Sequence, residues 1–461
     1  MITINYQKYI NSYYFLQDSF VGGDDYKNPR YASQTLTKTI VVDDNIINKV
    51  STYNSYLIPH EQESVISYLQ RKENAVYLNL VEPIISAYTS PLEQVKRTFT
   101  DPVMSDVFAN GKNFYRGLDY QSFIKFIAEQ TALFGHLFII MDSLTDEQGN
   151  FSKLVPVVLN PIQVKEVYLS EIDLSIEGLE WERMDGTCIK VTKEGFIIEK
   201  DEEEFIIPLK EGYPFPVQVV YFKKDMSKDF PMGLSLVSDT AEIGKKIYNQ
   251  SSWLNEVVNN TGFPFLALPN NMDAGEIPVE SKIAVGTKNA IQYPANSGAP
   301  SYIETSGQST EQLRQIIADE ISNAFKTKGL NSFEMVDSQA ASGVAIKIRN
   351  SLFESKAKTF LQNIHSLEIW IMNYLSIILG LDQVEYTIMY PVNIVAPDAA
   401  SQIQNWLSLL QTAKDYGTVS PALFKLVFEQ LLSQGFSLTD EQKQMFMGSV
   451  EEIVTSQTQT V

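Results

Sequence analysis

The chain is poor in the residues that build disulfide frameworks and metal cages. Its 461 residues include one cysteine, Cys188, and three histidines. A single cysteine excludes an intrachain disulfide framework and a thiolate cage for a metal, and it is compatible with a reducing cytoplasm. His60, His136 and His365 lie far apart, each without a partner at the spacing of metal ligands. We therefore expect no metal site and no cofactor.

Positive charge is scarce as well. The chain has 36 Lys and Arg against 56 Asp and Glu, a net charge of −20. Proteins held on nucleic acid by a basic surface need clustered Lys and Arg for the phosphates, so this balance argues against that class. It does not exclude a protein that lets DNA slide past without binding it. The sequence also lacks a GxxxxGK[ST] phosphate loop, which excludes an ATPase of that type.

Long apolar runs are missing too. The nearest approach to the roughly 20 apolar residues of a membrane span is the stretch 369–380, which Asn373 and Ser376 interrupt. The first residues lack a basic region followed by an apolar core, so we expect no signal peptide. The sequence thus predicts no contact with a membrane.

The most informative stretch is residues 340–380. The segment Ala341-Ser-Gly-Val-Ala-Ile-Lys347 leads into a run whose apolar residues recur at steps of three, four and eight, a helical period. No proline interrupts the run, and Gly380 stands where a C-terminal cap is expected. Such a helix would span roughly 55 Å, too long for the core of an ordinary compact domain. Because strict heptads are absent, we interpret it as the spine of a larger assembly. The apolar positions are Val344, Ile348, Leu352, Phe360, Ile364, Leu367, Ile371, Leu375 and Ile378.

The first half of the chain has the pattern of a mixed α/β body. Residues 1–50 are polar, with weak periodicity, and we expect an extended or partly disordered arm there. A helix is predicted to begin at Pro59, because proline suits the first helical position and Glu61 and Glu63 suit the N-terminal dipole. Further predictions are helices within 77–88 and 123–133, a buried strand over 137–141, and an antiparallel meander over 155–222 with a hairpin turn at Asp185-Gly186.

The sequence pattern in the second half of the chain predicts a stalk of two helices. A helix over about 235–260 is ended by Gly262 and Pro264, and short strand-like runs follow at 263–268, 283–285, 290–293 and 301–304. The capping box Ser309-Thr-Glu-Gln312 opens a returning helix, which Lys328-Gly329-Leu330 ends. A polar loop, 331–342, then reaches the long helix, and the pattern becomes helical again after Pro391. Two helices that flank a small β module form a stalk with a knob on its end.

With these local sequences, the layout resembles the portal proteins of tailed bacteriophages from about residue 45 to 440. Four segments carry the resemblance, and their order and spacing are more specific than any one of them. They are Tyr56-Leu-Ile-Pro-His60 with Tyr68-Leu-Gln-Arg71 and Tyr77-Leu-Asn79; Leu133-Phe-Gly-His-Leu-Phe-Ile-Ile-Met-Asp142; Ser235-Leu-Val-Ser-Asp239 continuing through Asn249-Gln-Ser-Ser-Trp253 to Gly262-Phe-Pro; and Ser342-Gly-Val-Ala-Ile-Lys347.

The resemblance implies an α+β portal fold with wing, stem, clip and crown. The parts would be an N-terminal arm (1–44), an α/β wing (45–234), stem helices (235–261 and 309–328), a small β clip (262–308), a tunnel loop (329–342), a spine helix that returns to the wing (343–390), and a helical crown with the C-terminal tail (391–461). The crown is short for the family, which puts a large internal barrel in doubt.

The resemblance also implies a function without catalysis. Portal proteins form a ring, usually of twelve subunits, at one capsid vertex of the virion. Double-stranded DNA passes through the ring in both directions without sequence specificity. Expected partners are further copies of the chain, the major capsid protein, the terminase and a head–tail adaptor, with assembly in the host cytoplasm. An acidic ring would repel DNA over most of its lumen and so lower friction rather than build affinity.

Three groups of residues are candidates for contacts in such a ring. Leu254 and Val258 lie on one face of the first stem helix and are expected between subunits. Stem lysines are either solvated helix faces or DNA-facing cations: Lys245, Lys246, Lys326 and Lys328. The tunnel loop carries polar groups suited to transient phosphate contacts, together with two acids: Asn331, Ser332, Glu334, Asp337, Ser338, Gln339 and Ser342.

Two other classes compete with this interpretation. An enzyme, most plausibly a hydrolase with paired carboxylates, would need a nucleophile–base pair or metal-ligand spacing that the sequence does not offer. Another non-enzymatic virion protein, a minor capsid or adaptor component, would be expected to be smaller and to lack the β knob. The run Asp201-Glu-Glu-Glu204 is interpreted as a solvated hairpin turn rather than a cation site, and Cys188 as a half-buried strand residue rather than a nucleophile.

Overall fold

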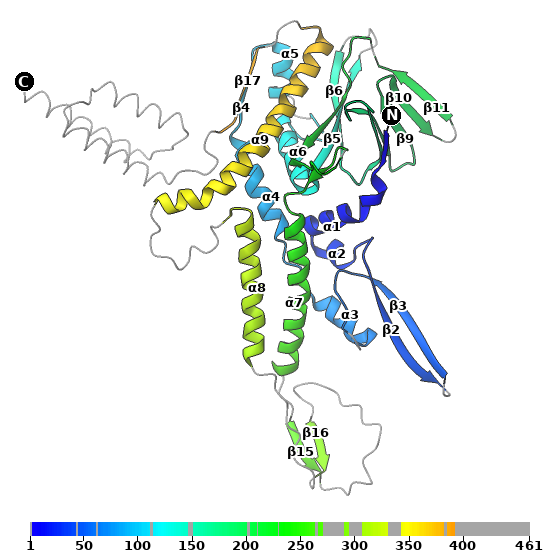
Figure 1. Cartoon of the computed structure of the whole chain (residues 1–461), viewed down its shortest axis with the longest axis vertical. Helices are drawn as coiled ribbons and strands as arrows, with labels where there is room; N and C mark the ends of the chain where they lie inside the picture. The colour runs from blue at the N-terminus through cyan, green and yellow to red at the C-terminus, as the bar shows by residue number, and fades with distance from the viewer. Residues whose placement is uncertain are drawn as a thin grey trace, which may run out of the picture. The chain divides into compact units, whose positions relative to one another are not determined.

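The computed structural model describes residues 2–42, 45–60, 63–110, 114–145, 151–200, 203–209, 211–228, 230–262, 266–270, 290–294, 307–330, 343–381 and 385–391. The chain divides into two compact units, one formed by Met1–Ser338 with Ser351–Pro391 and the other by Gln339–Asn350 with Val392–Val461. All described residues belong to the first unit except 343–350. Helices and antiparallel sheets both occur in it, in agreement with the predicted α+β class (Figure 1). The predicted crown, from residue 392 on, lies outside the described residues.

The N-terminal residues are part of the body. A strand, β1 (Ile2–Asn5), is followed by the helices α1 (Ile10–Val21) and α2 (Gly23–Lys27). The side chains of Tyr6, Tyr13, Leu16 and Tyr26 are buried, and Tyr6 packs edge-on against Phe138. The expected extended arm is therefore wrong for residues 2–27. Tyrosines at irregular spacing fill the core here, and they carry no helical or strand period. The segment also contains η1 (Tyr6–Tyr9) and continues into a long hairpin of β2 (Ser33–Val42) and β3 (Asn45–Asn54).

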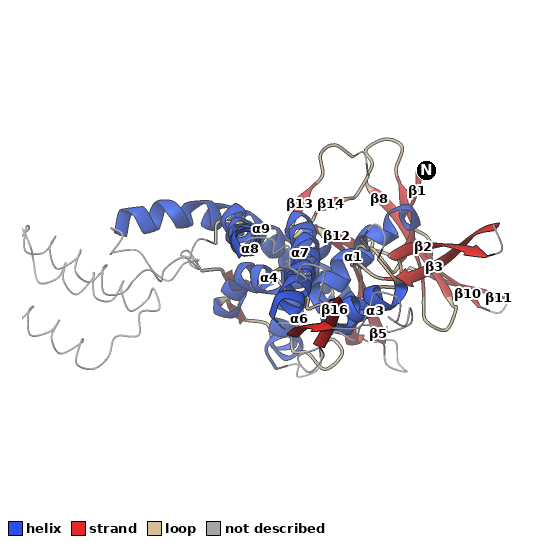
Figure 2. Ribbon diagram, turned by 90° about the horizontal axis from the view of Figure 1, so that it is seen from below, coloured by secondary structure: helices blue, strands red, loops and turns tan. Residues whose placement is uncertain are grey.

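The two largest sheets of the described residues are antiparallel and have six and three strands; Figure 2 shows their strands in red. The buried strand predicted over 137–141 is β5, whose side chains at these positions are fully buried at the centre of a three-stranded sheet, β12-β5-β6. The predicted meander holds only in part, because β6 and β12 pair with β5 while the strands between them form the sheet β1-β7-β8-β9-β10-β11. The strands are β5 (His136–Thr145), β6 (Phe151–Leu159), β7 (Val164–Leu169), β8 (Ile176–Glu182), β9 (Cys188–Thr192), β10 (Gly195–Lys200), β11 (Glu203–Pro208) and β12 (Val217–Tyr221).

Helices complete the body. The predicted helices within 77–88 and 123–133 are confirmed as α4 (Val81–Thr89) and α6 (Tyr120–Phe134), and Asp119 caps α6 by accepting from the Ser122 backbone N–H. The helix predicted from Pro59 begins later, as α3 (Val65–Asn74), because Ser64 provides the N-cap. Smaller elements are η2 (Ser90–Gln94), β4 (Lys96–Phe99), α5 (Pro102–Ser105), η3 (Asp106–Asn110), β13 (Lys223–Lys224) and β14 (Gly233–Leu234).

The stalk helices are α7 (Ser238–Gly262) and α8 (Gly307–Thr327), which pack side by side (Figure 1). Helix α8 begins two residues before the predicted capping box and ends where Lys328 and Gly329 were expected to end it. Between the helices, β15 (Leu266–Asn270) and β16 (Ala290–Pro294) pair in parallel. They match two of the four predicted strand-like runs, and the runs at 283–285 and 301–304 lie outside the described residues.

The predicted spine helix is confirmed as α9 (Gly343–Leu379), a helix of 37 residues that ends before Gly380 with its φ of 66°. Its apolar stripe is buried against the body from Phe353 to Ile378. Strand β17 (Tyr386–Met389) then pairs with β4 and returns the chain to the body. None of the described helices is long and apolar enough to cross a membrane.

Candidate functional site

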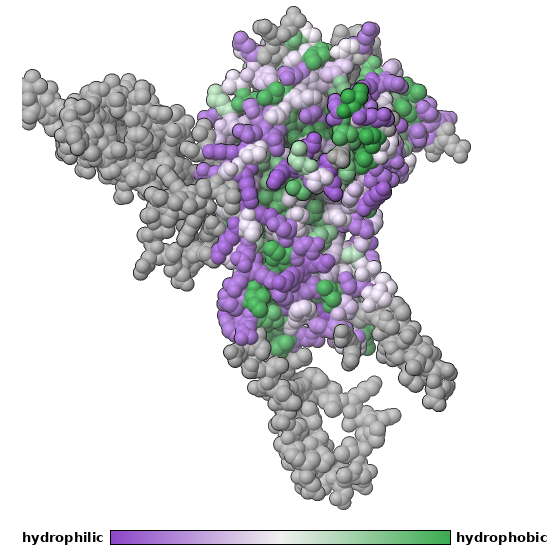
Figure 3. All heavy atoms as spheres, in the orientation of Figure 1, coloured by the Kyte–Doolittle hydropathy of each residue, from purple (hydrophilic) through white to green (hydrophobic). Residues whose placement is uncertain are grey.

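The paired stem helices leave apolar side chains uncovered. Near the body the pair is well packed, with Ala241 and Ile247 of α7 and Ala324 and Phe325 of α8 buried. Further along, Leu254 is only half-buried and several larger groups face solvent. They are Trp253 at 37% exposure, Val258 at 51% and, on α8, Ile316 at 45%. Figure 3 shows such apolar spots among the polar side chains of the stem.

The four stem lysines have different surroundings. Lys246 on α7 is exposed and forms an ion pair with Glu320 on α8, which ties the two helices together. Lys326 is also exposed. The ammonium group of Lys245 lies over the rings of Phe15 and Tyr56, 5.5 and 5.9 Å from their centroids, so it packs against the body.

Lys328 faces the interior of the chain. It is 8% exposed, and its Nζ lies 2.5 Å from Oδ1 of Asp239 in the first turn of α7. The hydroxyl of Tyr88 donates to the Lys328 carbonyl at 2.8 Å. A buried, paired ammonium group is not available to a ligand in this conformation, so the structure gives Lys328 a role in joining α7, α8 and α4.

Gly329 completes this junction between stem and spine. Its φ is +79°, and a Cβ added there would lie 2.7 Å from the backbone nitrogen of Phe353 on α9. Only glycine has the freedom for this φ and permits so close an approach of two backbones. Beside it, Nζ of Lys356 donates to the Thr327 carbonyl at 3.2 Å. The end of α8 is thus fixed against α9 immediately before the predicted tunnel loop.

The candidate tunnel-loop residues follow directly, and all of them lie outside the described residues. The structure therefore tests none of these site predictions, which concern Asn331, Ser332, Glu334, Asp337, Ser338, Gln339 and Ser342.

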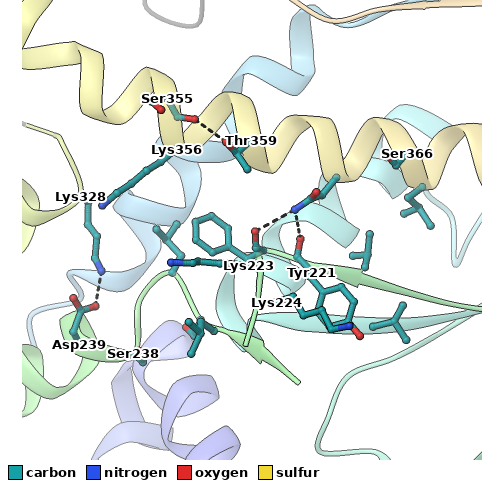
Figure 4. Close-up of a pocket in the computed structure, with 18 of the residues that line it drawn as sticks. Tyr221, Lys223, Lys224, Ser238, Asp239, Lys328, Ser355, Lys356, Thr359 and Ser366 are labelled. Atoms are coloured by element: carbon teal, nitrogen blue, oxygen red, sulfur yellow. Dashed lines mark hydrogen bonds and ion pairs between the residues drawn. The ribbon is translucent and has the colours of Figure 1, made fainter. Parts of the chain in front are cut away.

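A cavity of about 910 Å³ opens beside the junction, and we call it the basic groove (Figure 4). Its walls come from β12, β13, the start of α7 and the α9 segment 355–367, and its charged lining consists of Lys223, Lys224, Lys328, Lys356 and Asp239. Sequence reasoning missed it. The adjacent pair Lys223-Lys224 was the visible signal, but only folding brings it near Lys328 and Lys356.

Other titratable groups have structural surroundings. His136 is fully buried between Tyr6 and Tyr13, accepts from the Gly233 N–H at 3.2 Å, and has its pKa lowered to about 3 by burial. Burial raises the pKa of Cys188 to about 11, and Sγ donates to Oε1 of Glu180. The half-buried strand position predicted for Cys188 is confirmed. Among the described residues, no group of His, Cys, Asp and Glu is arranged to hold a metal.

Comparisons with known proteins give structural matches only. No family model and no curated protein matches the chain. Its fold is similar to a chain in the neck of an empty gene transfer agent (GTA) particle computed with C6 symmetry, with a TM-score of 0.47 and 16% identity over 81% of this chain and 94% of that one. A chain of the native GTA virion matches with a TM-score of 0.45 at 16% identity, covering 78% of this chain and 89% of that one. A chain of the native GTA neck computed with C12 symmetry matches with a TM-score of 0.40 at 16% identity, covering 71% of this chain and 83% of that one.

Proposed function

We propose that this chain is a portal protein: it closes into a ring at one capsid vertex, forms the channel for packaging and ejection of double-stranded DNA, and docks the terminase and the head–tail connector proteins. It acts as a conduit without catalysis of its own. The observation that carries the proposal is the stem, two long antiparallel helices that join a 37-residue helix and leave apolar side chains uncovered.

Uncovered apolar groups on the stem are what a ring contact needs. Trp253 and Val258 of α7 and Ile316 of α8 are at least one-third exposed in the single chain. Packing each stem against the next would remove these side chains from water, which stabilises a contact by about 25 cal/mol per Å² of apolar area. In a ring, each copy uses two different patches, so the same apolar groups recur around the whole circle.

The channel itself would be steadied by few cations. Lys246 and Lys326 are exposed, and we assign them the contacts with the DNA backbone, for which Lys246 would exchange its partner Glu320 for a phosphate. The ammonium groups of Lys245 and Lys328 lie against the body. The net charge of −20 keeps the rest of the lumen repulsive. DNA would then pass without being held, as a conduit requires.

The mass of the intact oligomer tests the proposal. We expect native mass spectrometry and negative-stain images of the purified chain to show rings with a central hole. Replacing Leu254 and Val258 with glutamate should weaken the rings, because the carboxylates would be buried between stems. Single subunits at all concentrations would refute the proposal. A compact oligomer without a hole would favour another virion component, and hydrolytic activity of monomers would favour an enzyme.

The tunnel loop is tested separately. Deleting residues 331–339 should leave rings intact and impair DNA filling or retention in assembled particles. Loss of the rings would show instead that the loop is structural. Unchanged DNA filling would refute the proposed contacts of the loop with DNA.

A further inference from the structure

The basic groove is an exception in an acidic chain. Its lining includes four lysines and one aspartate, although the chain as a whole carries a net charge of −20. The single acid, Asp239, is paired with Lys328, which leaves three lysines in excess. Figure 4 shows Lys223 and Lys356 at the same end of the groove as this ion pair. A concentration of uncompensated cations favours an anionic occupant.

None of these three lysines has a carboxylate partner among the residues that the structure describes. Lys223 and Lys224 are exposed and form no ion pair within the part of the chain that the structure describes. Lys356 is exposed, and among the described residues it donates to one backbone carbonyl, that of Thr327. The groove also has an apolar side, since Leu234 is 44% exposed and Val219 and Phe222 are half-buried. The occupant it fits is both acidic and apolar.

The hairpin of β10 and β11 has this composition. The sequence carries four consecutive acids here, Asp201-Glu-Glu-Glu204, of which Glu203 and Glu204 begin β11, and three large apolar residues of β11 follow. Phe205, Ile206 and Ile207 are 52%, 64% and 53% exposed. Among the described strands, β11 pairs only with β10, so it is an edge strand with apolar groups on both faces. Such an edge is an association hazard unless a partner covers it.

The hairpin does not occupy the groove of its own chain. No residue of β10 or β11 contributes to the lining, and Figure 2 shows the two strands well apart from β13 and β14. The two complementary surfaces are therefore different patches of one molecule. A contact between different patches is heterologous, which is the arrangement that closes into rings.

We propose that the basic groove receives the β10–β11 hairpin of the neighbouring copy. Glu203 and Glu204 of the hairpin meet the lysines Lys223, Lys224 and Lys356, and Phe205 to Ile207 cover the apolar side of the groove. This inference rests on the proposed ring, and it adds a second contact between copies, in the body rather than in the stem. Because the contact is partly electrostatic, it weakens as salt is added.

Charge reversal tests the contact. The groove variant combines Lys223→Glu with Lys224→Glu, and a hairpin variant combines Glu203→Lys with Glu204→Lys. A matched control, Lys228→Glu with Lys358→Glu, makes the same change in net charge at exposed lysines outside the groove. Native mass spectrometry at an ionic strength of about 0.1 M measures the fraction of chain in rings. We expect the groove variant to lose rings at least tenfold, the control to keep them, and the combined groove and hairpin variant to regain them.

Disulfide trapping gives a second measurement that does not depend on stability. In a Cys188→Ser background the chain has no other cysteine. Glu204→Cys with Lys224→Cys should then give a ladder of linked copies on oxidation, because a disulfide needs Cα atoms within about 7 Å. Glu204→Cys with Lys358→Cys should give none.

The outcomes separate this inference from the proposed function. Rings of the groove variant as abundant as those of wild type, or a loss that the combined variant does not restore, would overturn the hairpin contact and leave the portal proposal standing. A ladder from the control cysteine pair equal to that from the groove pair would overturn it too. A wild-type chain that forms no rings would overturn both.

Discussion

The strongest prediction concerns a buried ion pair that ties the spine helix to the body. Glu368 on α9 is fully buried, and its two carboxylate oxygens accept from Nε and Nη2 of Arg97 on β4, at 2.7 and 2.8 Å. The Tyr390 hydroxyl donates to Oε1 of Glu368 at 2.5 Å. The Arg97 guanidinium also lies 5.5 Å from the centroid of the Tyr120 ring. Strand, spine and return segment meet at this one carboxylate.

Arg97→Met removes one partner and keeps most of the volume. Breaking a buried pair in this way costs about 3–5 kcal/mol, because the remaining charge is left buried. The Tyr390 hydrogen bond survives and stabilises the carboxylate, so we expect a loss near 3 kcal/mol, which is roughly 150-fold in the folding equilibrium. Replacing both partners by methionine should restore most of that loss, since an apolar pair of similar volume leaves no buried charge.

Urea unfolding at pH 7, followed by tryptophan fluorescence at one protein concentration, measures the change, since oligomerisation couples to stability. Lys125→Met is the matched control, because its partner Glu93 is 61% exposed and the pair lies at the surface. An exposed pair of this kind contributes at most about 1 kcal/mol. A midpoint shift for Arg97→Met no larger than that of Lys125→Met would refute the reasoning, and so would a double variant less stable than Arg97→Met alone.

Three further predictions follow from single side chains. Between pH 6.5 and 3, His136 is protonated in the unfolded chain but stays neutral in the folded chain, because burial lowers its pKa to about 3. The urea midpoint of wild type should therefore fall more steeply with decreasing pH than that of His136→Gln. Equal slopes would contradict the lowered pKa. Gly329→Ala should cost about 1–3 kcal/mol and more than Gly380→Ala, because both have positive φ but only Gly329 lies against another backbone, that of Phe353; equal costs would contradict the close approach. Iodoacetamide should label Cys188 at pH 8 roughly a hundredfold more slowly in the folded than in the urea-unfolded chain, because its pKa is raised to about 11; similar rates would count against that shift.

Periodic signals in the sequence predicted the long elements well. The apolar stripe of α9 and the glycine at its end gave the helix and its C-terminus, because a helix that buries one face must repeat it every turn. The Asp185-Gly186 turn predicted the hairpin of β8 and β9, since its geometry depends on two residues only. Sequence patterns therefore predict a helix or a turn correctly when residues close together in the chain determine its conformation.

Segments without a period were predicted badly. Residues 2–27 resemble a polar arm, yet their tyrosines fill a core supplied by distant elements such as β5 and α6. Pro59 and the acids that follow it have the pattern of a helix N-terminus, but α3 begins at Val65. Its N-cap is Ser64, whose side chain accepts a hydrogen bond from the Ser67 backbone N–H. The partners that decide these cases lie far along the chain, where sequence spacing cannot identify them.

The stem lysines show the same limit at the site. Lys326 and Lys328 are two residues apart and look equivalent in sequence, but one is exposed and the other is buried against Asp239. Whether a lysine is available to a ligand depends on a carboxylate 89 positions away. The basic groove was missed for the same reason, because its lysines come from three separate segments.

Polar contacts explain how so long a helix keeps one position. Apolar side chains recur along α9, so hydrophobic packing alone would tolerate a shift by one turn, about 5.4 Å. Glu368 and Asn363 do not tolerate it. Such a shift would move the buried carboxylate away from Arg97 and would remove the Asn363 amide from the carbonyls of Tyr221 and Phe222, to which it donates at 3.0 and 3.2 Å. The free energy lost by leaving the Glu368 carboxylate buried without Arg97 exceeds what the apolar packing of the shifted helix could recover. The position of the spine, and with it the place where the 331–342 loop begins, therefore depends on a few polar side chains, and the Arg97 substitution tests that dependence.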